Sequence, residues 1–456
     1  MASLQIVIMA AGKGTRMKSA RPKVLHRLAG KSLLQHVLDA VAGLGASRTL
    51  VVTGHGAPTV EAEAAAPGVT FVRQEPQLGT GHAVQQVAAH LDSAGTTLIL
   101  NGDVPLIQAA TAAALVAACG GTKLALLTTL LTDASGYGRI VRDGAAVKAI
   151  VEHKDASPAQ RQVREIYTGM LAAPTAWLTR AVMALKNDNV QGEYYLTDIV
   201  AMAVADGIAV VATQASSETE VLGVNSPVQL ADLERRYQRA RAEALMEDSG
   251  VRLADPARFD LRGTLVCGSD VEIDVGCVFE GQVSLADNVR IGAHCVVRDA
   301  QIDTGAVIHP FSHIEGARIG AGALVGPYAR LRPGTELGPE VHIGNFVEVK
   351  NSTLAKGAKA NHLAYLGDST LGERVNFGAG SITANYDGAH KHRTVIGADV
   401  HVGSNCVLVA PVTIGERATI GSGSTIAKDA PAGQLTLARA RQVSLAGWTR
   451  PKKAAK

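Results

Sequence analysis

Aromatic residues, paired cysteines and long apolar runs are scarce in this sequence of 456 residues. Phe, Trp and Tyr make up only 4% of it, so its cores must be built mainly from Val, Ile, Leu and Ala. The five cysteines form no CxxC pair, and their odd number argues against a disulfide framework and favours a reducing compartment. No run of about 18 apolar residues and no signal-peptide pattern occurs, so we expect a cytoplasmic protein without a membrane partner. The net charge of +3 is close to balance and gives no sign of a nucleic-acid partner.

The second half of the sequence has an aliphatic residue at every sixth position, usually followed by a small residue. The pattern runs from about Val266 to Asp429 and includes the series Ile396, Val402, Leu408, Ile414, Ile420 and Ile426. A period of six fits neither an α-helix nor an alternating strand. It fits a parallel β-helix, whose short strands each send one aliphatic side chain into an interior too narrow for aromatic rings. The alternative, a glycine-rich β-sandwich, would require this spacing to arise by chance.

The first half has a different pattern, in which apolar strands alternate with Ala-rich helical stretches. Leu4–Met9 leads into the glycine-rich turn Ala10–Met17, and strand-like runs follow at Leu50–Val52, Thr70–Val72, Thr97–Leu100 and Leu124–Thr129. This alternation predicts a mostly parallel, Rossmann-like α/β sheet with ligands at the carboxyl ends of its strands. The turn lacks both the GK[ST] of a Walker motif and the third glycine of the dinucleotide fingerprint, but its layout still suits phosphate binding.

Charged residues near this turn suit a nucleoside triphosphate. Arg16 and Lys23 would balance the phosphate charge, and Asp103, which follows the strand Thr97–Leu100, is a natural Mg²⁺ ligand. The alternatives are a solvated helix face for the two cations and a turn cap for Asp103. The combination with the glycine-rich turn favours a nucleotide site.

A helix is predicted to connect the two halves. Ser226 suits its N-cap, Pro227 its first turn and Gly250 its end. Its charges of both signs favour a solvated face over nucleic-acid contact. The predicted organisation is therefore an α/β domain over residues 1–227, a linker helix over 228–249, and a β-helix with a C-terminal tail over 250–456.

Several motifs make a family resemblance specific. Met9–His26 resembles the signature of the sugar-1-phosphate nucleotidyltransferases, and the later motifs of that family follow in order at Gln77–Ala83, Gly136–Ile140, Val151–Ala156 and Gly192–Asp198. With the six-residue repeat behind them, the chain resembles, from about Ile6 to Arg439, the bifunctional family that makes UDP-N-acetylglucosamine. The resemblance implies acetyl transfer from acetyl-CoA to glucosamine 1-phosphate, followed by uridylyl transfer from UTP to N-acetylglucosamine 1-phosphate. It also implies a left-handed β-helix and a homotrimer with the acetyl-transfer site between neighbouring copies.

The resemblance assigns the uridylyl-transfer site to the first half of the chain. It implies Arg16 and Lys23 as catalytic residues that offset the phosphate charge, with Asp103 and Asn225 as Mg²⁺ ligands. The implied contacts to nucleotide and sugar are Met9, Ala10, Ala11, Gly12, Lys23, Gln74, Gly79, Thr80, Asn101, Gly102, Asp103, Gly138, Glu152, Tyr167 and Asn225. Two positions depart from the family pattern, because Asn101 stands where Tyr is common and Tyr167 where Asn is usual. These departures put direct contacts at the two positions in doubt.

The resemblance assigns the acetyl-transfer site to the β-helix. His362 is implied as the general base, a task that suits an imidazole, and Glu348 is a candidate for orienting it. The implied contacts to the sugar phosphate are Arg332, Lys350, Tyr365 and Asn376, and those to acetyl-CoA are Ala379, Asn385, Tyr386, Ser404, Ser422 and Arg439. Ser422 stands where Ala is common. The six-residue period breaks at Asn385–Arg393, a polar excursion typical of a binding loop, and its two histidines lack a third ligand for a metal.

Two other functions are left open by the residues alone. The first is a single-activity sugar-1-phosphate nucleotidyltransferase whose β-helix regulates or oligomerises the protein. The cluster of His362, Tyr365, Lys350 and Arg332 argues against it, because a scaffold does not need these groups. The second is a non-catalytic coil protein, against which the glycine-rich turn and Asp103 argue.

Overall fold

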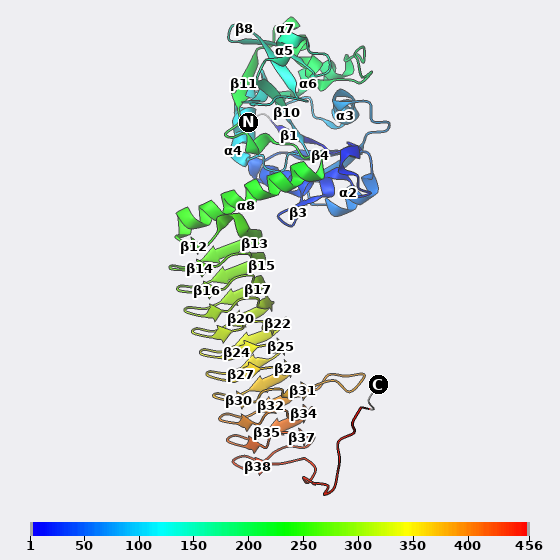
Figure 1. Cartoon of the computed structure of the whole chain (residues 1–456). Helices are drawn as coiled ribbons and strands as arrows, with labels where there is room; N and C mark the ends of the chain where they lie inside the picture. The colour runs from blue at the N-terminus through cyan, green and yellow to red at the C-terminus, as the bar shows by residue number, and fades with distance from the viewer. Residues whose placement is uncertain (1–2, 454–456) are drawn as a thin grey trace. The chain divides into compact units, whose positions relative to one another are not determined.

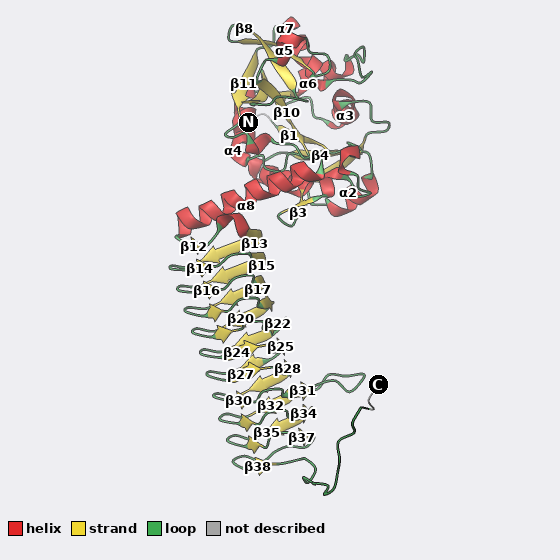
Figure 2. Cartoon of the chain, in the orientation of Figure 1, coloured by secondary structure: helices red, strands yellow, loops and turns green. Residues whose placement is uncertain are grey.

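The chain folds into two compact units that divide between Tyr237 and Gln238, within helix α8 (Pro227–Ser249). The computed structural model describes residues 3–453, so the outermost residues of the first and last predicted domains lie outside it. The α-helices belong to the first unit and to α8, whereas the second unit consists of short strands (Figures 1 and 2). Within the described range, no helix is both long and apolar enough to cross a bilayer.

The first unit contains a mostly parallel sheet. Its main path runs β11 (Val210–Gln214), β7 (Leu124–Leu130), β10 (Glu165–Pro174), β6 (Thr96–Asn101), β1 (Leu4–Met9), β4 (Arg48–Thr53) and β5 (Val69–Arg73), with β8 (Gly138–Asp143) and β9 (Ala146–Val151) attached through β10. Strand β10 is antiparallel to both β6 and β7. A small hairpin of β2 (Arg27–Leu28) and β3 (Lys31–Ser32) lies apart from this sheet.

Helices cover both faces of the sheet and explain its continuous apolar strands. On β1, Ile6 and Ile8 pack into one core with α1 (Leu33–Val41), α2 (Ala57–Glu63) and α4 (Ala109–Cys119). Val7 faces the other way, into a core with α3 (Thr80–Val87), α6 (Thr175–Met183) and α7 (Ile199–Ala205). A strand buried on both faces is apolar at every position, which is the pattern that the sequence shows. The short helix α5 (Pro158–Arg161) follows β9.

The second unit is a parallel β-helix with three ladders of strands. One ladder runs through β12 (Arg252–Leu253), β14 (Glu272–Ile273), β16 (Arg290–Ile291), β18 (Val307–Ile308), β21 (Leu324–Val325), β24 (His342–Asn345), β27 (Lys359–His362), β30 (Asn376–Phe377), β33 (His401–Val402), β36 (Thr419–Ile420) and β38 (Leu435–Thr436). The second runs through β19 (His313–Glu315), β22 (Arg330–Leu331), β25 (Glu348–Lys350), β28 (Tyr365–Gly367), β31 (Ile382–Ala384), β34 (Val407–Val409) and β37 (Thr425–Ile426). The third runs through β20 (Ala317–Ile319), β23 (Thr335–Leu337), β26 (Thr353–Leu354), β29 (Ser369–Leu371), β32 (Thr394–Ile396) and β35 (Val412–Ile414).

The second and third ladders join at the start of the β-helix, where single longer strands take the place of pairs. These strands are β13 (Phe259–Cys267), β15 (Cys277–Leu285) and β17 (Val296–Ile302). Equivalent positions on regular neighbouring coils are 17 or 18 residues apart, which corresponds to about three hexapeptides per coil, and 25 apart where a loop is inserted. The predicted fold class, an α/β unit followed by a β-helix of hexapeptide repeats, is therefore confirmed.

The interior of the β-helix is one continuous apolar core, built from the aliphatic residues of the six-residue pattern. Coils approach so closely that a Cβ added to Gly344 would lie 2.0 Å from the carbonyl oxygen of Asn361, which explains a glycine beside the inward-facing Ile343. The expectation that the interior has no room for rings is wrong. Phe259, Phe279 and Phe377 are buried in it, and the rings of the first two contact each other with centroids 5.7 Å apart.

We predict that Leu331→Ala destabilises the β-helix by roughly 2–5 kcal/mol, because Leu331 is fully buried and its loss leaves a cavity between coils. Chemical denaturation of the full chain would measure the transition of the β-helix. The matched control Val266→Ala removes an exposed side chain of the same unit and should leave that transition nearly unchanged. Equal effects of the two substitutions would contradict the assignment of Leu331 to a tightly packed core.

Two candidate active sites

A cleft with two lobes opens at the carboxyl ends of β1 and β6 in the first unit. A cavity of about 550 Å³ and a neighbouring one of about 350 Å³ share Met9, Thr80, Asn101 and Asp103 in their walls. The predicted nucleotide and sugar contacts line one or both cavities, with the exception of Gly102. The side chain of Arg16 is exposed in the short helix η1 (Thr15–Met17), and Arg16 belongs to neither wall. The structure therefore brings together all but one of the predicted contacts, and not the predicted catalytic Arg16.

The larger lobe is shaped by backbone. The glycine-rich turn follows β1 directly and contributes the wall from Ala10 to Thr15. Gln74 lies opposite, almost fully buried, and its side-chain amide donates to the carbonyl oxygen of Gly79 at 3.0 Å. Gly79 has a φ of +108°, and a Cβ there would lie 2.6 Å from the carbonyl oxygen of Tyr194, so this position requires glycine. A wall of backbone amides with few side chains suits close approach by phosphates.

Three polar side chains from distant parts of the sequence meet where the two lobes join. The ammonium group of Lys23 donates to Oδ2 of Asp103 at 2.5 Å and to Oδ1 of Asn225 at 3.1 Å. The side chains of Lys23 and Asp103 are only 13% and 18% exposed. A carboxylate and an amide oxygen thus converge on one cation, and oxygen donors of this kind also fit Mg²⁺.

The smaller lobe contains a buried carboxyl group. Glu152 accepts a hydrogen bond from the hydroxyl of Thr197 at 3.1 Å. Burial raises the pKa of Glu152, and the nearby carboxylates of Asp155, Asp198 and Glu193 raise it further, against the lowering effect of the Thr197 hydrogen bond. The smaller lobe is therefore polar, but ionisation of a carboxyl group in it costs free energy.

Both positions that depart from the family pattern lie in this lobe. Tyr167 is buried on β10, and its hydroxyl has no hydrogen-bond partner among the residues that the structure describes. Burial raises its pKa, so the phenol is a neutral donor. The side-chain amide of Asn101 instead donates to the carbonyl oxygen of Thr168 at 3.3 Å. Tyr167 therefore has a free donor at the cavity wall, whereas Asn101 is partly engaged by the protein.

In the β-helix, predicted acetyl-transfer residues form a column along one corner. His362, Ala379 and Ser404 each accept a backbone hydrogen bond from the corner residue of the next coil, at 3.2, 2.8 and 2.8 Å. The backbone carbonyl of Ser422 belongs to the following coil and accepts a hydrogen bond from the guanidinium of Arg439 at 2.9 Å. Residues spread over the last third of the sequence therefore lie in line beside His362.

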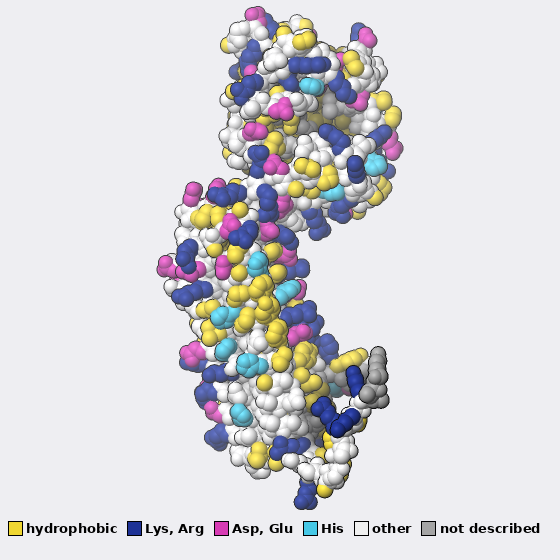
Figure 3. Space-filling model, viewed as in Figure 1, with side chains coloured by type: hydrophobic (Ala, Val, Ile, Leu, Met, Phe, Trp, Pro, Cys, Tyr) yellow, Lys and Arg dark blue, Asp and Glu magenta, His cyan; other side chains and the backbone are white. Residues whose placement is uncertain are grey.

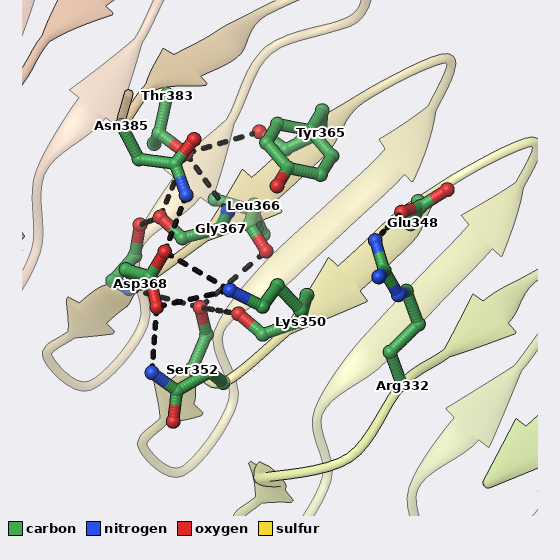
Figure 4. Close-up of polar contacts among 12 residues, drawn as sticks. Arg332, Glu348, Lys350, Ser352, Tyr365, Leu366, Gly367, Asp368, Thr383 and Asn385 are labelled. Carbon is green, nitrogen blue, oxygen red and sulfur yellow. Dashed lines mark hydrogen bonds and ion pairs between the residues drawn. The ribbon is translucent and has the colours of Figure 1, made fainter. Parts of the chain in front are cut away.

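Cations and carboxylates alternate on the adjacent ladder (Figure 4). Arg332 donates to Oε1 of Glu348 at 2.8 Å, and the ammonium of Lys350 lies 3.3 Å from Oδ2 of Asp368. Glu348, the candidate for orienting His362, is therefore paired with Arg332. Ring nitrogen Nδ1 of His362 is hydrogen-bonded to Asn345 instead, at 2.8 Å.

Asp368 fastens the predicted binding loop to the β-helix. Its buried carboxylate accepts from the side-chain amides of Asn351 and Asn385, at 2.6 and 2.5 Å. Burial alone would raise the pKa of Asp368, but these two hydrogen bonds and the Lys350 ammonium lower it overall. The side-chain amide of Asn385, a predicted acetyl-CoA contact, is thus engaged by Asp368, whereas Tyr386 is exposed on the loop that projects beside β31 (Figure 1).

Lys391 on this loop is a cation that sequence reasoning missed. Lys350, its neighbour in space, lowers the pKa of Lys391, and the charge of Arg332 contributes in the same direction. Three cations therefore gather at one place, an arrangement that an anionic group would stabilise. Lys391 lies in an irregular loop outside the six-residue pattern, and only the run of basic residues from Lys391 to Arg393 points to it in the sequence.

Comparison with known proteins defines the class of each unit. Residues 6–253 match the model of the MobA-like NTP transferase domain, and residues 316–351 and 393–428 match that of the bacterial transferase hexapeptide. The chain thus combines a nucleotidyltransferase unit with a hexapeptide-repeat transferase unit.

Curated relatives match over the whole length. The "Bifunctional protein GlmU" of Methylibium petroleiphilum is 75% identical over 459 residues, covering 99% of both chains. The proteins of the same name from Polaromonas naphthalenivorans and Azoarcus sp. are 66% and 60% identical, covering 99% of this chain and 98% and 100% of theirs. The chain belongs to the GlmU family. This membership confirms the predicted resemblance and the bifunctional transferase interpretation, and the single-activity alternative is not favoured.

We predict that Glu152→Gln raises the thermal stability of the first unit more at pH 8 than at pH 4. The raised pKa of Glu152 means that ionisation costs more in the folded than in the unfolded chain, so the wild type loses stability as pH rises through the folded-state pKa. Gln can still accept from Thr197 and carries no charge. Melting temperatures across this pH range would measure the difference, with Asp143→Asn, at an exposed acid, as the control. A difference that stays constant or shrinks towards pH 8 would contradict the account.

Proposed function

We propose that the two units catalyse consecutive steps of UDP-N-acetylglucosamine synthesis. The β-helix transfers acetyl from acetyl-CoA to glucosamine 1-phosphate, and the α/β unit joins the product to UMP from UTP with release of pyrophosphate. The observation that carries this proposal is the presence of two separate sites on one chain, each with cations for a phosphate. Family membership supports the same assignment.

In uridylyl transfer, the oxygen of the sugar 1-phosphate attacks the α-phosphorus of UTP in line with the departing pyrophosphate. The amides of the glycine-rich turn bind phosphate oxygens in the larger lobe, and the sugar occupies the smaller one. There Glu152 accepts a hydrogen bond from a sugar hydroxyl, and Tyr167 donates one through its free phenol. No protein nucleophile is needed, because positioning and charge neutralisation carry most of phosphoryl transfer.

A magnesium ion fits the junction of the lobes. Asp103 and Asn225 would hold it, because their oxygens already converge on the Lys23 ammonium. When bound, the ion supplies charge neutralisation at the phosphates. Lys23 would provide a second positive charge for the same phosphates.

In acetyl transfer, the amine of glucosamine 1-phosphate attacks the thioester carbonyl. The C–N bond forms, the C–S bond breaks, and the proton of the amine passes to Nε2 of His362 and on to the leaving thiolate. Arg332, Lys350 and Lys391 bind the sugar phosphate, with Tyr365 on the same ladder. Asn376 contributes from the neighbouring ladder, on the coil after His362. Acetyl-CoA extends along the corner column from Ala379 through Ser404 and Ser422 towards Arg439, with Asn385 and Tyr386 at the edge of the loop.

The two activities should separate by mutation. Asp103→Asn is expected to lower uridylyl transfer at least about 100-fold while acetyl transfer persists. The substitution removes the negative charge of the carboxylate that would hold the cation at the phosphates. His362→Ala is expected to do the reverse. Pyrophosphate release and free thiol, measured in separate assays on each variant, would test this. Loss of both activities in one variant, at unchanged thermal stability, would contradict two independent sites.

We further propose that the chain forms a homotrimer through the β-helix. An exposed ladder of rings, the corner ladder, runs through His294, Phe311, Tyr328 and Phe346, with neighbouring centroids 5.0 to 5.3 Å apart and Leu363 in the next coil. Hydrophobic side chains also gather on the β-helix face seen in Figure 3, with histidines among them. A contiguous apolar strip of this kind suits burial against another copy. Leu363 directly follows His362, so we expect the acetyl-transfer site to lie at that contact.

Tyr328→Arg should therefore weaken assembly and acetyl transfer together. A buried unpaired charge in the contact is costly, whereas the uridylyl-transfer cleft lies in the other unit. Light scattering coupled to size-exclusion chromatography would give the mass, and the two assays the activities. Val228→Arg, at an exposed apolar position of the first unit, should leave all three unchanged. A Tyr328→Arg variant of unchanged mass and full acetyl transfer would rule out the corner ladder as the contact.

A further inference from the structure

His362 and Asn345 occupy the same corner position on successive coils. They are register partners in the ladder of β24 and β27. Each is followed by a residue with left-handed backbone, Phe346 at φ 57° and Leu363 at φ 51°, so the chain turns identically after both. The close approach at Gly344 fixes the spacing between these coils. The side chain of Asn345 is therefore held at a constant place beside the imidazole.

The two side chains meet in one defined hydrogen bond. Oδ1 of Asn345 lies 2.8 Å from Nδ1 of His362. An amide oxygen only accepts, so the hydrogen of this bond is on Nδ1. In the neutral ring the remaining nitrogen, Nε2, then has the free lone pair. His362 is exposed in the single chain, so this lone pair is accessible to a substrate amine.

We propose that Asn345 is a positioning residue of acetyl transfer, which holds His362 in the Nδ1–H tautomer with Nε2 directed to the substrate. The inference rests on the proposed function of His362 as the general base. It goes beyond that function by naming the group that selects which ring nitrogen takes the proton.

A neutral partner suits this task better than a carboxylate. A carboxylate stabilises the protonated imidazole and so raises the pH at which the ring loses its proton. On the nearby loop the chain does place an imidazole beside a carboxylate, because Nε2 of His392 lies 2.6 Å from Oδ2 of Asp387. At His362 the amide orients the ring without adding negative charge beside it.

The ionisable groups around the pair are cationic or already paired. His342 on β24 lies close enough to be influenced: desolvation lowers its pKa, and the charges of Lys359, His309 and His362 lower it further. On the adjacent ladder, Glu348 is paired with Arg332. On the next coils of the ladder that contains His362, the side chain of Asn376 is bonded to His401. Asn345 thus remains as the side chain hydrogen-bonded to the imidazole in the described structure.

The β-helix itself does not require this side chain. Leu363 donates its backbone N–H to the backbone carbonyl of Asn345, a bond that any residue at position 345 can make. Asn345→Ala and the isosteric Asn345→Asp should therefore fold and assemble like the wild type. A change in acetyl transfer in these variants then reflects the orientation of the His362 imidazole and not misfolding of the β-helix.

The test measures acetyl transfer by free thiol, as a function of pH, in the full-length protein. Asn345→Ala is expected to lower kcat about 10- to 1,000-fold with little change in KM for either substrate, because the base loses its orientation. Asn345→Asp is expected to retain more of kcat than Asn345→Ala and to shift the acidic limb of the pH profile upward by about one pH unit or more. Uridylyl transfer, measured by pyrophosphate, should be unchanged in both.

The outcomes separate this inference from the proposed function. If His362→Ala retains acetyl transfer, the proposed base is wrong and the inference fails with it. If His362→Ala is inactive but Asn345→Ala keeps its kcat, or Asn345→Asp leaves the pH profile unchanged, only the role of Asn345 is overturned. Thermal melting and light scattering on each variant exclude loss of folding or assembly as the cause.

Discussion

The hydrogen bonding between successive coils of the β-helix is the constraint on which its core and its chemistry depend. Each residue lies beside the residue at the equivalent position of the next coil, which is 17 or 18 positions along the chain in regular coils and 25 where the loop intervenes. Inward-facing columns of aliphatic residues therefore become one continuous core. A corner column becomes a line of functional groups, in which Asn345, His362, Ala379 and Ser404 follow one another along one edge. The apolar core and the proposed acetyl-transfer residues thus occupy different columns of the β-helix, so a residue of the corner column can change without disturbing the interior.

The α/β unit also brings together residues that are distant in the sequence, but it does so at one edge of its sheet. Parallel strands end at one edge of the sheet, so residues after β1 and β6 come together despite their distance in sequence. Lys23, Asp103 and Asn225 meet there, with the positive charge of the lysine balanced between two oxygen groups. The protein holds this charge cluster at the junction of two cavities, which suits the proposed reaction because that reaction depends on placing two phosphates. Each unit therefore carries its own cluster of cations, to which we assign phosphate binding.

Much of this architecture follows from periodicity, and much of the chemistry does not. The period of six predicts the β-helix because it records which side chains point inwards, and the continuous apolar run of β1 predicts a strand covered on both faces. By contrast, nothing in the spacing predicts that Glu348 pairs with Arg332 or that Asn345 bonds to His362, because both depend on side-chain rotamers across neighbouring coils. Lys391 was missed because its loop leaves the repeat. The buried rings of Phe279 and Phe377 show that the interior adapts to single large residues.

The central claim is that one chain carries two independent transferase sites that act in sequence. It is tested most directly by supplying the protein with glucosamine 1-phosphate, acetyl-CoA, UTP and magnesium, and following free thiol and pyrophosphate separately. The account predicts that both are released, that thiol precedes pyrophosphate, and that omission of acetyl-CoA abolishes pyrophosphate release unless N-acetylglucosamine 1-phosphate is added. Release of only one of the two products, or rapid pyrophosphate release from glucosamine 1-phosphate without acetyl-CoA, would contradict it.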